Sequence, residues 1–368
     1  MKVLHLIDSP NRGGAETLVL DLCRNAKQNG LDITIVGTRV GALNEDFRFS
    51  GADYYYLPRR HTIDILLISK LSMLVKKKNI QIIHVHQAVD GIHAFLVRLI
   101  TGVKIVMTFH GHVPNKKDDK VLNFLIPRMN ANIAVSNTFL ERLKQEFNII
   151  KKKNFVVIYN GIDTKKFYKI NSELRKELKI GDSDILMGMI GNFNDNIRDQ
   201  LTICKVLPTL LSENKNFHFI FVGRRAIENP EYYNDCFELC KKSQLLDKVH
   251  FMGPRSDINN ILNSLDAFVY ASKYDTFGIA VVEAMMAGVP VIMNDLPPLL
   301  EISNNGEFAE IYRSRDFENL NDKIKKLIKD KRYKEYLGLK GKEWALQKFS
   351  IENHISNLKK LYSTIITK

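Results

Sequence analysis

The chain of 368 residues has no apolar run approaching the roughly 20 residues that span a bilayer. Its first residues, Met1 to Asp8, reach an acidic side chain too early for the apolar core of a signal peptide. The four cysteines show no zinc-ligand spacing. We therefore predict a cytoplasmic protein whose cysteines are reduced and lie in the core.

Acidic residues are fewer than basic ones, with 41 Asp and Glu against 54 Lys and Arg and a net charge of +13. The excess lies in the first 165 residues, which hold 24 basic and 14 acidic side chains. No helix-turn-helix, zinc-finger or RNA-binding signature accompanies this charge, which argues against a nucleic-acid partner. Two interpretations stay open: an ordinary solvated surface, or peripheral contact with the anionic inner face of the cytoplasmic membrane.

The length is too great for one hydrophobic core and fits two domains of ordinary size. Short apolar runs alternate with helical periodicity along the whole chain, which predicts an α/β protein with parallel sheets. We also expect a Lys-rich helix over 317–334 and a final helix over 351–366. The expected strands are 2–7, 31–36, 54–57, 81–86, 103–108, 131–136, 155–159, 185–191, 217–222, 249–253, 265–270 and 289–293.

The segment 268–301 carries the strongest functional signal. It reads as strand, polar loop, helix and strand, and the helix begins near Phe277-Gly278-Ile279. A helix N-terminus at the carboxyl edge of a parallel sheet is a ready anion site. Asp275 and Glu283, with seven residues between them, add carboxylates that accept hydrogen bonds from vicinal hydroxyls. Together these features predict a ligand with both phosphate and sugar groups.

This segment resembles the donor-binding motif of glycosyltransferase family 4, whose members are retaining, nucleotide-sugar-dependent enzymes of the GT-B fold. The resemblance implies two Rossmann-like domains that face each other across a cleft. Residues 1–164 would form the acceptor-side domain, on which the C-terminal helix of residues 351–368 would pack. Residues 165–350 would form the nucleotide-sugar-binding domain.

The resemblance also implies roles for individual residues. Glu283 would hold the ribose hydroxyls, and Asp275, as a catalytic residue, the hydroxyls of the transferred sugar. The helix start at Phe277, Gly278 and Ile279 would bind the donor. His110 would be a catalytic residue beside the reacting sugar, although a histidine hydrogen-bonded at a strand end is the alternative interpretation. The Gly13-Gly14-Ala15-Glu16 turn resembles the family's loop opposite the donor, so Gly13 and Gly14 would also contact the donor.

Several positions depart from the family pattern. Asn192, at a donor-binding position, stands where the family carries an arginine, and Arg198 takes the place of the lysine that binds the donor diphosphate. Arg224-Arg225, in the next loop, would then replace the missing cation. The prolines of Leu296-Pro297-Pro298 remove backbone N–H groups that often meet the donor.

A metal site is not predicted. His84, His86, His110 and His112 lie near neighbouring strand ends, but no carboxylate accompanies them at ligand spacing. We assign no Asp-x-Asp site to a divalent ion, because the triplet Asp182-Ser183-Asp184 precedes an expected strand and does not follow one. We therefore expect no cofactor, with the nucleotide-diphosphate sugar bound as a substrate without metal.

The function that follows is transfer of a sugar from a nucleotide-diphosphate sugar to an acceptor hydroxyl with retention of configuration. A glycan or lipid-linked acceptor would place the enzyme in surface polysaccharide or lipid-linked glycan synthesis. Two alternatives stay open. One is a nucleotide-sugar epimerase of the same fold, and the other is a non-catalytic protein that binds sugar nucleotides or glycans.

Overall fold

The computed structural model describes residues 1–11, 13–111, 115–147, 154–170, 172–194, 197–227 and 229–367. His112, one of the four histidines noted above, lies outside the described residues. The chain forms two compact units. Unit 1 contains Met1–Asp163 and Phe349–Lys368, and unit 2 contains Thr164–Lys348.

Unit 1 is built on a seven-stranded parallel sheet with the strand order β3-β2-β1-β4-β5-β6-β7. The order reverses between β1 and β4, and the loops that leave these two strands diverge there. Such a reversal creates a crevice at the carboxyl edge of a parallel sheet. The strands are β1 (Lys2–Ile7), β2 (Asp32–Gly37), β3 (Asp53–Tyr56), β4 (Ile82–Val85), β5 (Lys104–Phe109), β6 (Ala131–Ala134) and β7 (Phe155–Val157).

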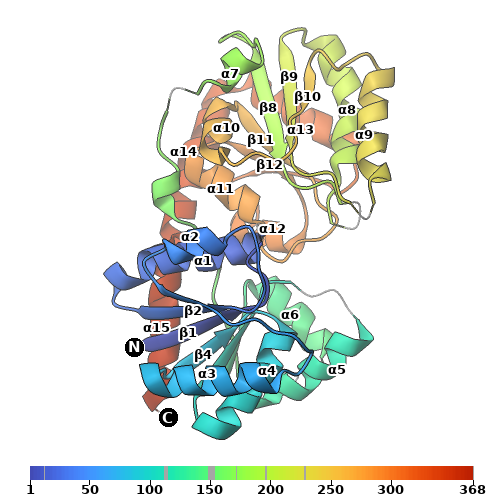
Figure 1. Cartoon of the computed structure of the whole chain (residues 1–368). Helices are drawn as coiled ribbons and strands as arrows, with labels where there is room; N and C mark the ends of the chain where they lie inside the picture. The colour runs from blue at the N-terminus through green and yellow to red at the C-terminus, as the bar shows by residue number, and fades with distance from the viewer. Residues whose placement is uncertain are drawn as a thin grey trace. The chain divides into compact units, whose positions relative to one another are not determined.

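Helices cover both faces of this sheet (Figure 1). Right-handed crossovers place helices that follow leftward and rightward connections on opposite faces. One face carries α1 (Gly14–Ala26), the short η1 (Lys27–Asn29), α2 (Asn44–Arg48) and α15 (Ile351–Thr367). The other carries α3 (Ile65–Lys78), α4 (Ala88–Thr101), α5 (Lys116–Leu125), η2 (Ile126–Arg128) and α6 (Asn137–Glu146).

The C-terminal helix α15 belongs to the core of unit 1. Ile355, Leu358 and Tyr362 are almost fully buried in one cluster with Val19 and Leu22 of α1. Burying an aliphatic side chain contributes about 1.5–3 kcal/mol, so this apolar stripe is enough to fix the helix in place.

Unit 2 is built on a six-stranded parallel sheet with the order β10-β9-β8-β11-β12-β13, which reverses between β8 and β11. Its strands are β8 (Ile185–Ile190), β9 (Phe217–Val222), β10 (Val249–Phe251), β11 (Ala267–Tyr270), β12 (Val291–Asn294) and β13 (Glu310–Tyr312). Its helices are η3 (Thr164–Lys166), α7 (Leu174–Glu177), α8 (Gln200–Glu213), α9 (Glu231–Lys242), α10 (Ile258–Ser264), α11 (Ile279–Ala287), α12 (Pro297–Ile302), α13 (Phe317–Lys329) and α14 (Lys331–Phe349).

The two doubly wound halves confirm the predicted α/β class and the Rossmann-like architecture. The cleft between the halves stays a prediction. The four cysteines are free and buried, as expected. Within the described residues, no helix combines the length and the apolar character needed to cross a membrane.

The single helix expected over 317–334 is wrong. Asp330 ends α13 and begins a second helix, α14, because its carboxylate accepts a hydrogen bond from the backbone N–H of Tyr333 at 2.9 Å. Helices typically begin where a side-chain oxygen accepts a hydrogen bond from the backbone N–H three residues further along the chain.

Candidate active site

The strand reversal in unit 2 brings together the two loops that follow β8 and β11. The backbone N–H of Asp199 donates to the carbonyl of Ala271 at 3.1 Å, and that of Lys273 donates to Ile197 at 2.8 Å. Arg198 and Ser272 form an isolated β-bridge between the same loops. The sequence-predicted residues Arg198 and Asp275 therefore meet at the position where open α/β sheets bind ligands.

Arg198 and Asp275 form an ion pair that is largely shielded from solvent. Arg198 Nη1 lies 3.1 Å from Asp275 Oδ2, and the two side chains are 21% and 11% exposed. The same nitrogen donates to Ser272 Oγ at 2.9 Å. The hydroxyl of Tyr270, a fully buried residue at the end of β11, donates to Asp275 Oδ2 at 2.8 Å. Asp275 is thus held from two sides through one carboxylate oxygen.

Two glycines give this site its shape. A Cβ atom on Gly191 would lie 3.2 Å from Arg198 Nε, so the missing side chain makes room for the guanidinium. Gly278 precedes α11 with φ of 96°, a left-handed conformation that other residues adopt only with strain. A Cβ there would also lie 2.7 Å from Leu299 Cδ2.

The start of α11 faces the same edge of the sheet, because the helix follows directly on the loop that carries Asp275. Phe277 is buried and anchors the turn, and Ile279 opens the helix. The first N–H groups of a helix have no partner within it and attract anions. Glu283 lies in the second turn and is half-buried.

Asn192 is exposed and joins two loops instead of carrying charge. Its Oδ1 accepts a hydrogen bond from the backbone N–H of Arg224 at 2.9 Å. The backbone N–H of Phe193 donates to the Arg224 carbonyl at 2.9 Å. The backbone of Arg224 is therefore fixed beside Asn192. The guanidinium of Arg225 lies over the Tyr233 ring, 5.7 Å from its centroid.

The prolines at 297 and 298 begin a helix. They are the first two residues of α12, where a missing N–H costs little. The next two N–H groups, those of Leu299 and Leu300, both donate to the carbonyl of Leu296 at 2.9 and 3.0 Å. The start of α12 therefore offers few backbone donors, as the sequence predicted.

In unit 1, His110 lies directly after β5 and belongs to a chain of imidazoles. Its Nε2 lies 2.9 Å from His86 Nδ1, and His86 Nε2 lies 3.1 Å from His5 Nδ1. Burial lowers the pKa of His5 and of His110 to about 3, and it lowers the pKa of His86 as well. These histidines are therefore neutral at physiological pH, because a buried imidazolium is poorly solvated.

Gly13 and Gly14 start α1 at the same edge of unit 1. A pocket of about 160 Å³ lies beside them, and its lining includes Asp8, Glu16 and His110. The sequence predicts no role for Asp8, His5 or the side chain of Glu16, and Tyr270 of unit 2 has the pattern of an ordinary strand residue.

Three of the described histidines, His5, His84 and His86, have ring nitrogens within 4.8 Å of one another and form a candidate metal group. Their geometry fits a metal poorly. The rings of His84 and His86 are stacked with an interplanar angle of 20°, so their lone pairs do not converge on one point. Both nitrogens of His84 are bonded to hydroxyls, Nδ1 to Tyr362 at 2.6 Å and Nε2 to Thr108 at 2.7 Å.

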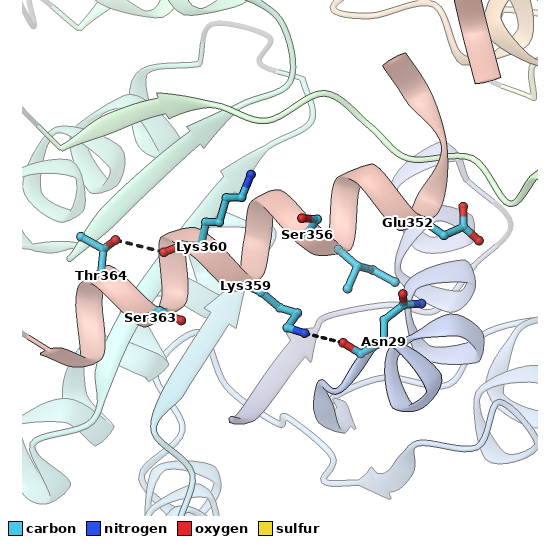
Figure 2. Close-up of a pocket in the computed structure, with 8 residues that line it drawn as sticks. Asn29, Glu352, Ser356, Lys359, Lys360, Ser363 and Thr364 are labelled. Carbon is cyan, nitrogen blue, oxygen red and sulfur yellow. Dashed lines mark hydrogen bonds between the residues drawn. The ribbon is translucent and has the colours of Figure 1, made fainter. Parts of the chain in front are cut away.

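A larger groove of about 600 Å³ runs along α15 (Figure 2). Figure 2 shows Lys359 reaching across it to the Asn29 carbonyl, while Lys360 points away. Lys359 Nζ donates to this carbonyl at a distance of 2.6 Å. Asn29 ends η1, three positions before the first residue of β2, so the groove lies at the amino end of that strand. Ligands of parallel sheets bind at the carboxyl ends, and this groove is therefore not a candidate active site.

Known proteins match both units. The family described as "Glycosyltransferase Family 4" matches residues 12–166, and "Glycosyl transferases group 1" matches residues 170–344. The N-acetyl-alpha-D-glucosaminyl L-malate synthase of Bacillus anthracis is 24% identical over 97% of this chain and 95% of its own. An Escherichia coli UDP-Gal:alpha-D-GlcNAc-diphosphoundecaprenol alpha-1,3-galactosyltransferase is 25% identical over 80% of each chain.

The same fold occurs among solved structures. HepE of Anabaena, solved in complex with UDP and glucose, superposes with a TM-score of 0.86 over 99% of this chain and 100% of its own, at 19% identity. The paired Rossmann-like units are those of a GT-B protein, and the two family matches together span most of the sequence. This chain therefore belongs to glycosyltransferase family 4 and is a glycosyltransferase.

Proposed function

We propose that the enzyme transfers a sugar from a nucleotide-diphosphate sugar to an acceptor hydroxyl with retention of configuration. The observation that carries this proposal is the Arg198–Asp275 pair at the strand reversal of unit 2, beside the N-terminus of α11. At this place the Arg198 cation and the N–H groups of α11 can bind a diphosphate, and the Asp275 carboxylate can bind sugar hydroxyls. Glu283 would bind the ribose hydroxyls from the second turn of the same helix.

Arg198 is suited to stabilise the leaving diphosphate. Its Nη1 is used by Asp275 and Ser272, which fixes the plane of the guanidinium and leaves its other N–H groups to reach the phosphates. Donors that are held in place before charge develops need no reorganisation during the reaction. Arg224, tied to Asn192, would add the second positive charge.

The bond changes are those of a substitution at the anomeric carbon. The bond from this carbon to the diphosphate oxygen breaks, and a bond to the acceptor oxygen forms on the same face. The acceptor hydroxyl proton passes to the departing phosphate oxygen. His110 would support the reacting sugar as a neutral hydrogen-bonding group, since burial keeps its pKa at about 3.

We also propose that the reaction needs no divalent metal. Arg198, Arg224 and the N-terminus of α11 supply positive charge where metal-dependent enzymes place a cation. Turnover measured with and without an excess of EDTA tests this: equal rates are expected, and a rate restored only by added Mg²⁺ or Mn²⁺ would refute it.

The acceptor is proposed to be a glycan or a lipid-linked glycan. The named activity of the Escherichia coli relative, which uses a diphosphoundecaprenol-linked acceptor, supports this. So does a mixed apolar and basic face on α3, where Ile65 and Met73 are 81% and 60% exposed beside Lys76 and Lys77. Such a face suits the headgroup region of an anionic membrane.

The membrane part is tested by flotation with anionic vesicles. We expect binding at low salt that is lost at high salt and weakened by Met73→Asp with Lys76→Ala. Failure of the wild-type protein to float with the vesicles at low salt would refute the proposed membrane contact.

The reaction itself is tested by proton NMR of the product. An anomeric coupling constant that matches the donor's configuration is expected, and inversion would refute the retaining mechanism. Epimerised donor formed without acceptor would instead favour the epimerase interpretation.

A further inference from the structure

The pocket of about 160 Å³ in unit 1 has an unusual charge balance. Its charged lining side chains are Asp8, directly after β1, and Glu16, in the first turn of α1, and both are acidic. Its histidines, His86 and His110, are neutral because they are buried. Gln87 and apolar groups complete the lining. No lysine or arginine is among these lining residues, although the chain as a whole has a net charge of +13.

The negative charge of Asp8 is already compensated from outside the pocket. Arg59 Nη2 lies 2.6 Å from Asp8 Oδ1, and Arg59 Nε lies 3.2 Å from the same oxygen. The Arg59 side chain is only 8% exposed, so it is held in this pair. Among the residues that the structure describes, no basic side chain pairs with Glu16, so Glu16 is the acidic group that a ligand in the pocket meets.

Glu16 also occupies the place where an external anion would bind. It is the third residue of α1, and its carboxylate lies against Gly13, whose missing side chain gives it room. A glutamate at this position folds back over the helix N-terminus and complements its positive end. A carboxylate or phosphate from a ligand would have to displace Glu16 or lie next to it.

We propose that this pocket receives the reacting sugar of an acceptor as a neutral, hydroxyl-bearing group, and that Glu16 rejects acceptors with a carboxylate or phosphate beside the reacting hydroxyl. Carboxylate, amide and neutral imidazole groups are the partners that sugar hydroxyls need. The Bacillus anthracis relative is named for L-malate, a hydroxy acid, and this pocket disfavours such an acceptor. The proposal rests on the proposed function, which supplies the acceptor.

The test compares the wild-type chain with Glu16→Gln. Glutamine keeps the length and hydrogen bonds of the side chain and still caps the helix, so folding is preserved while the charge is removed. Glu45→Gln, on α2 of the same unit, is the matched control because Glu45 is exposed and lies outside the pocket lining. The probes are L-malate and methyl α-D-glucopyranoside, followed through the histidine side-chain NMR signals of His110 and His86.

In the wild-type protein and in Glu45→Gln, the glucoside should shift the His110 signals and L-malate should not. In Glu16→Gln, the dissociation constant for L-malate should fall at least about tenfold, and this gain should shrink as salt increases. Equal malate binding by the wild-type protein and Glu16→Gln would overturn the proposal, as would a glucoside that leaves His110 unperturbed.

Failure of this proposal can be distinguished from failure of the reaction proposed for unit 2. Nucleotide-sugar turnover that persists while the His110 signals ignore both probes means that the acceptor binds elsewhere and refutes the pocket's role alone. Selective glucoside binding without any nucleotide-sugar turnover supports the charge selectivity and refutes the proposed reaction.

Discussion

Replacing Tyr270 with phenylalanine tests how the carboxylate of Asp275 is held. The substitution removes one hydroxyl from a fully buried position and keeps the ring, so packing changes little. What is lost is the 2.8 Å hydrogen bond to Asp275 Oδ2, while Arg198 still contacts the same oxygen at 3.1 Å. A hydrogen bond to a charged group contributes about 1.5–3 kcal/mol, and 1.4 kcal/mol is a tenfold change in rate.

Because Arg198 remains, we expect the lower end of this range: kcat/KM for the nucleotide sugar should fall about tenfold, and the melting temperature should fall by about 3–6 °C. The assay is release of the nucleoside diphosphate, measured for Tyr270→Phe, Asp275→Ala and the double variant. If Tyr270 acts through Asp275, adding Tyr270→Phe to the Asp275→Ala variant should lower kcat/KM by less than about twofold. An undiminished tenfold loss in the Asp275→Ala background, or wild-type activity of Tyr270→Phe, would refute the reasoning.

Three further predictions follow from the same structure. Arg224→Ala should raise the KM for the nucleotide sugar, whereas Arg225→Ala, whose guanidinium lies over Tyr233, should leave it within about twofold; equal effects of the two would contradict the assignment. Gly278→Ala should destabilise unit 2 by about 2–4 kcal/mol in urea unfolding, because alanine is strained in the left-handed conformation and its Cβ would clash with Leu299. Gly253→Ala is the control: its φ of 66° is also left-handed, but a Cβ there meets no atom within 4 Å, so the cost should be only about 1–2 kcal/mol. His5 has a pKa of about 3 in the folded protein against 6.5 when exposed, so the unfolded chain binds more protons between these two pH values. The free energy of unfolding should therefore fall by about 1.4 kcal/mol for each unit by which the pH drops from 6.5 toward 3. His5→Asn should reduce the slope of melting temperature against pH, and an unchanged slope would contradict the buried neutral state.

The architecture was predictable from the sequence because parallel strands that are buried on both faces consist of short runs of apolar residues. Strands such as Lys2–Ile7 and Phe217–Val222 lie where these runs lie. The break in the expected helix over 317–334 was missed because the helical periodicity looked continuous. Asp330 belongs to the residue types favoured at helix starts, but aspartate also occurs inside Lys-rich helices, so its presence alone did not mark the break.

The candidate donor site was predictable as a set of residues but not as a set of contacts. Asp275 and Arg198 are separated by 77 positions, and the ion pair between them exists because β8 and β11 are neighbours at the strand reversal. Tyr270 lies in an apolar strand and gave no polar signal, although its hydroxyl turns back to Asp275. The donor and catalytic roles of these residues stay predictions.

The histidine chain shows the same limit in unit 1. The sequence singled out His84, His86 and His110 from their closeness to strand ends. His5 was missed because it lies in the middle of an ordinary buried strand. The register of β1 against β4 places it opposite His84, and only the strand order makes that pairing apparent.

The central claim is that unit 2 binds a nucleotide-diphosphate sugar through Glu283, Arg198 and the start of α11. A thermal-shift screen of uridine, guanosine, adenosine and cytidine diphosphates and their sugars, without metal, tests it most directly. A ligand at about 100 times its Kd adds roughly 2.7 kcal/mol of stability, which raises the Tm of a unit of this size by about 5–10 °C. We predict a clear shift with one nucleotide and its loss in Glu283→Ala; no shift with any of them, or the same shift in Glu283→Ala, would contradict the account.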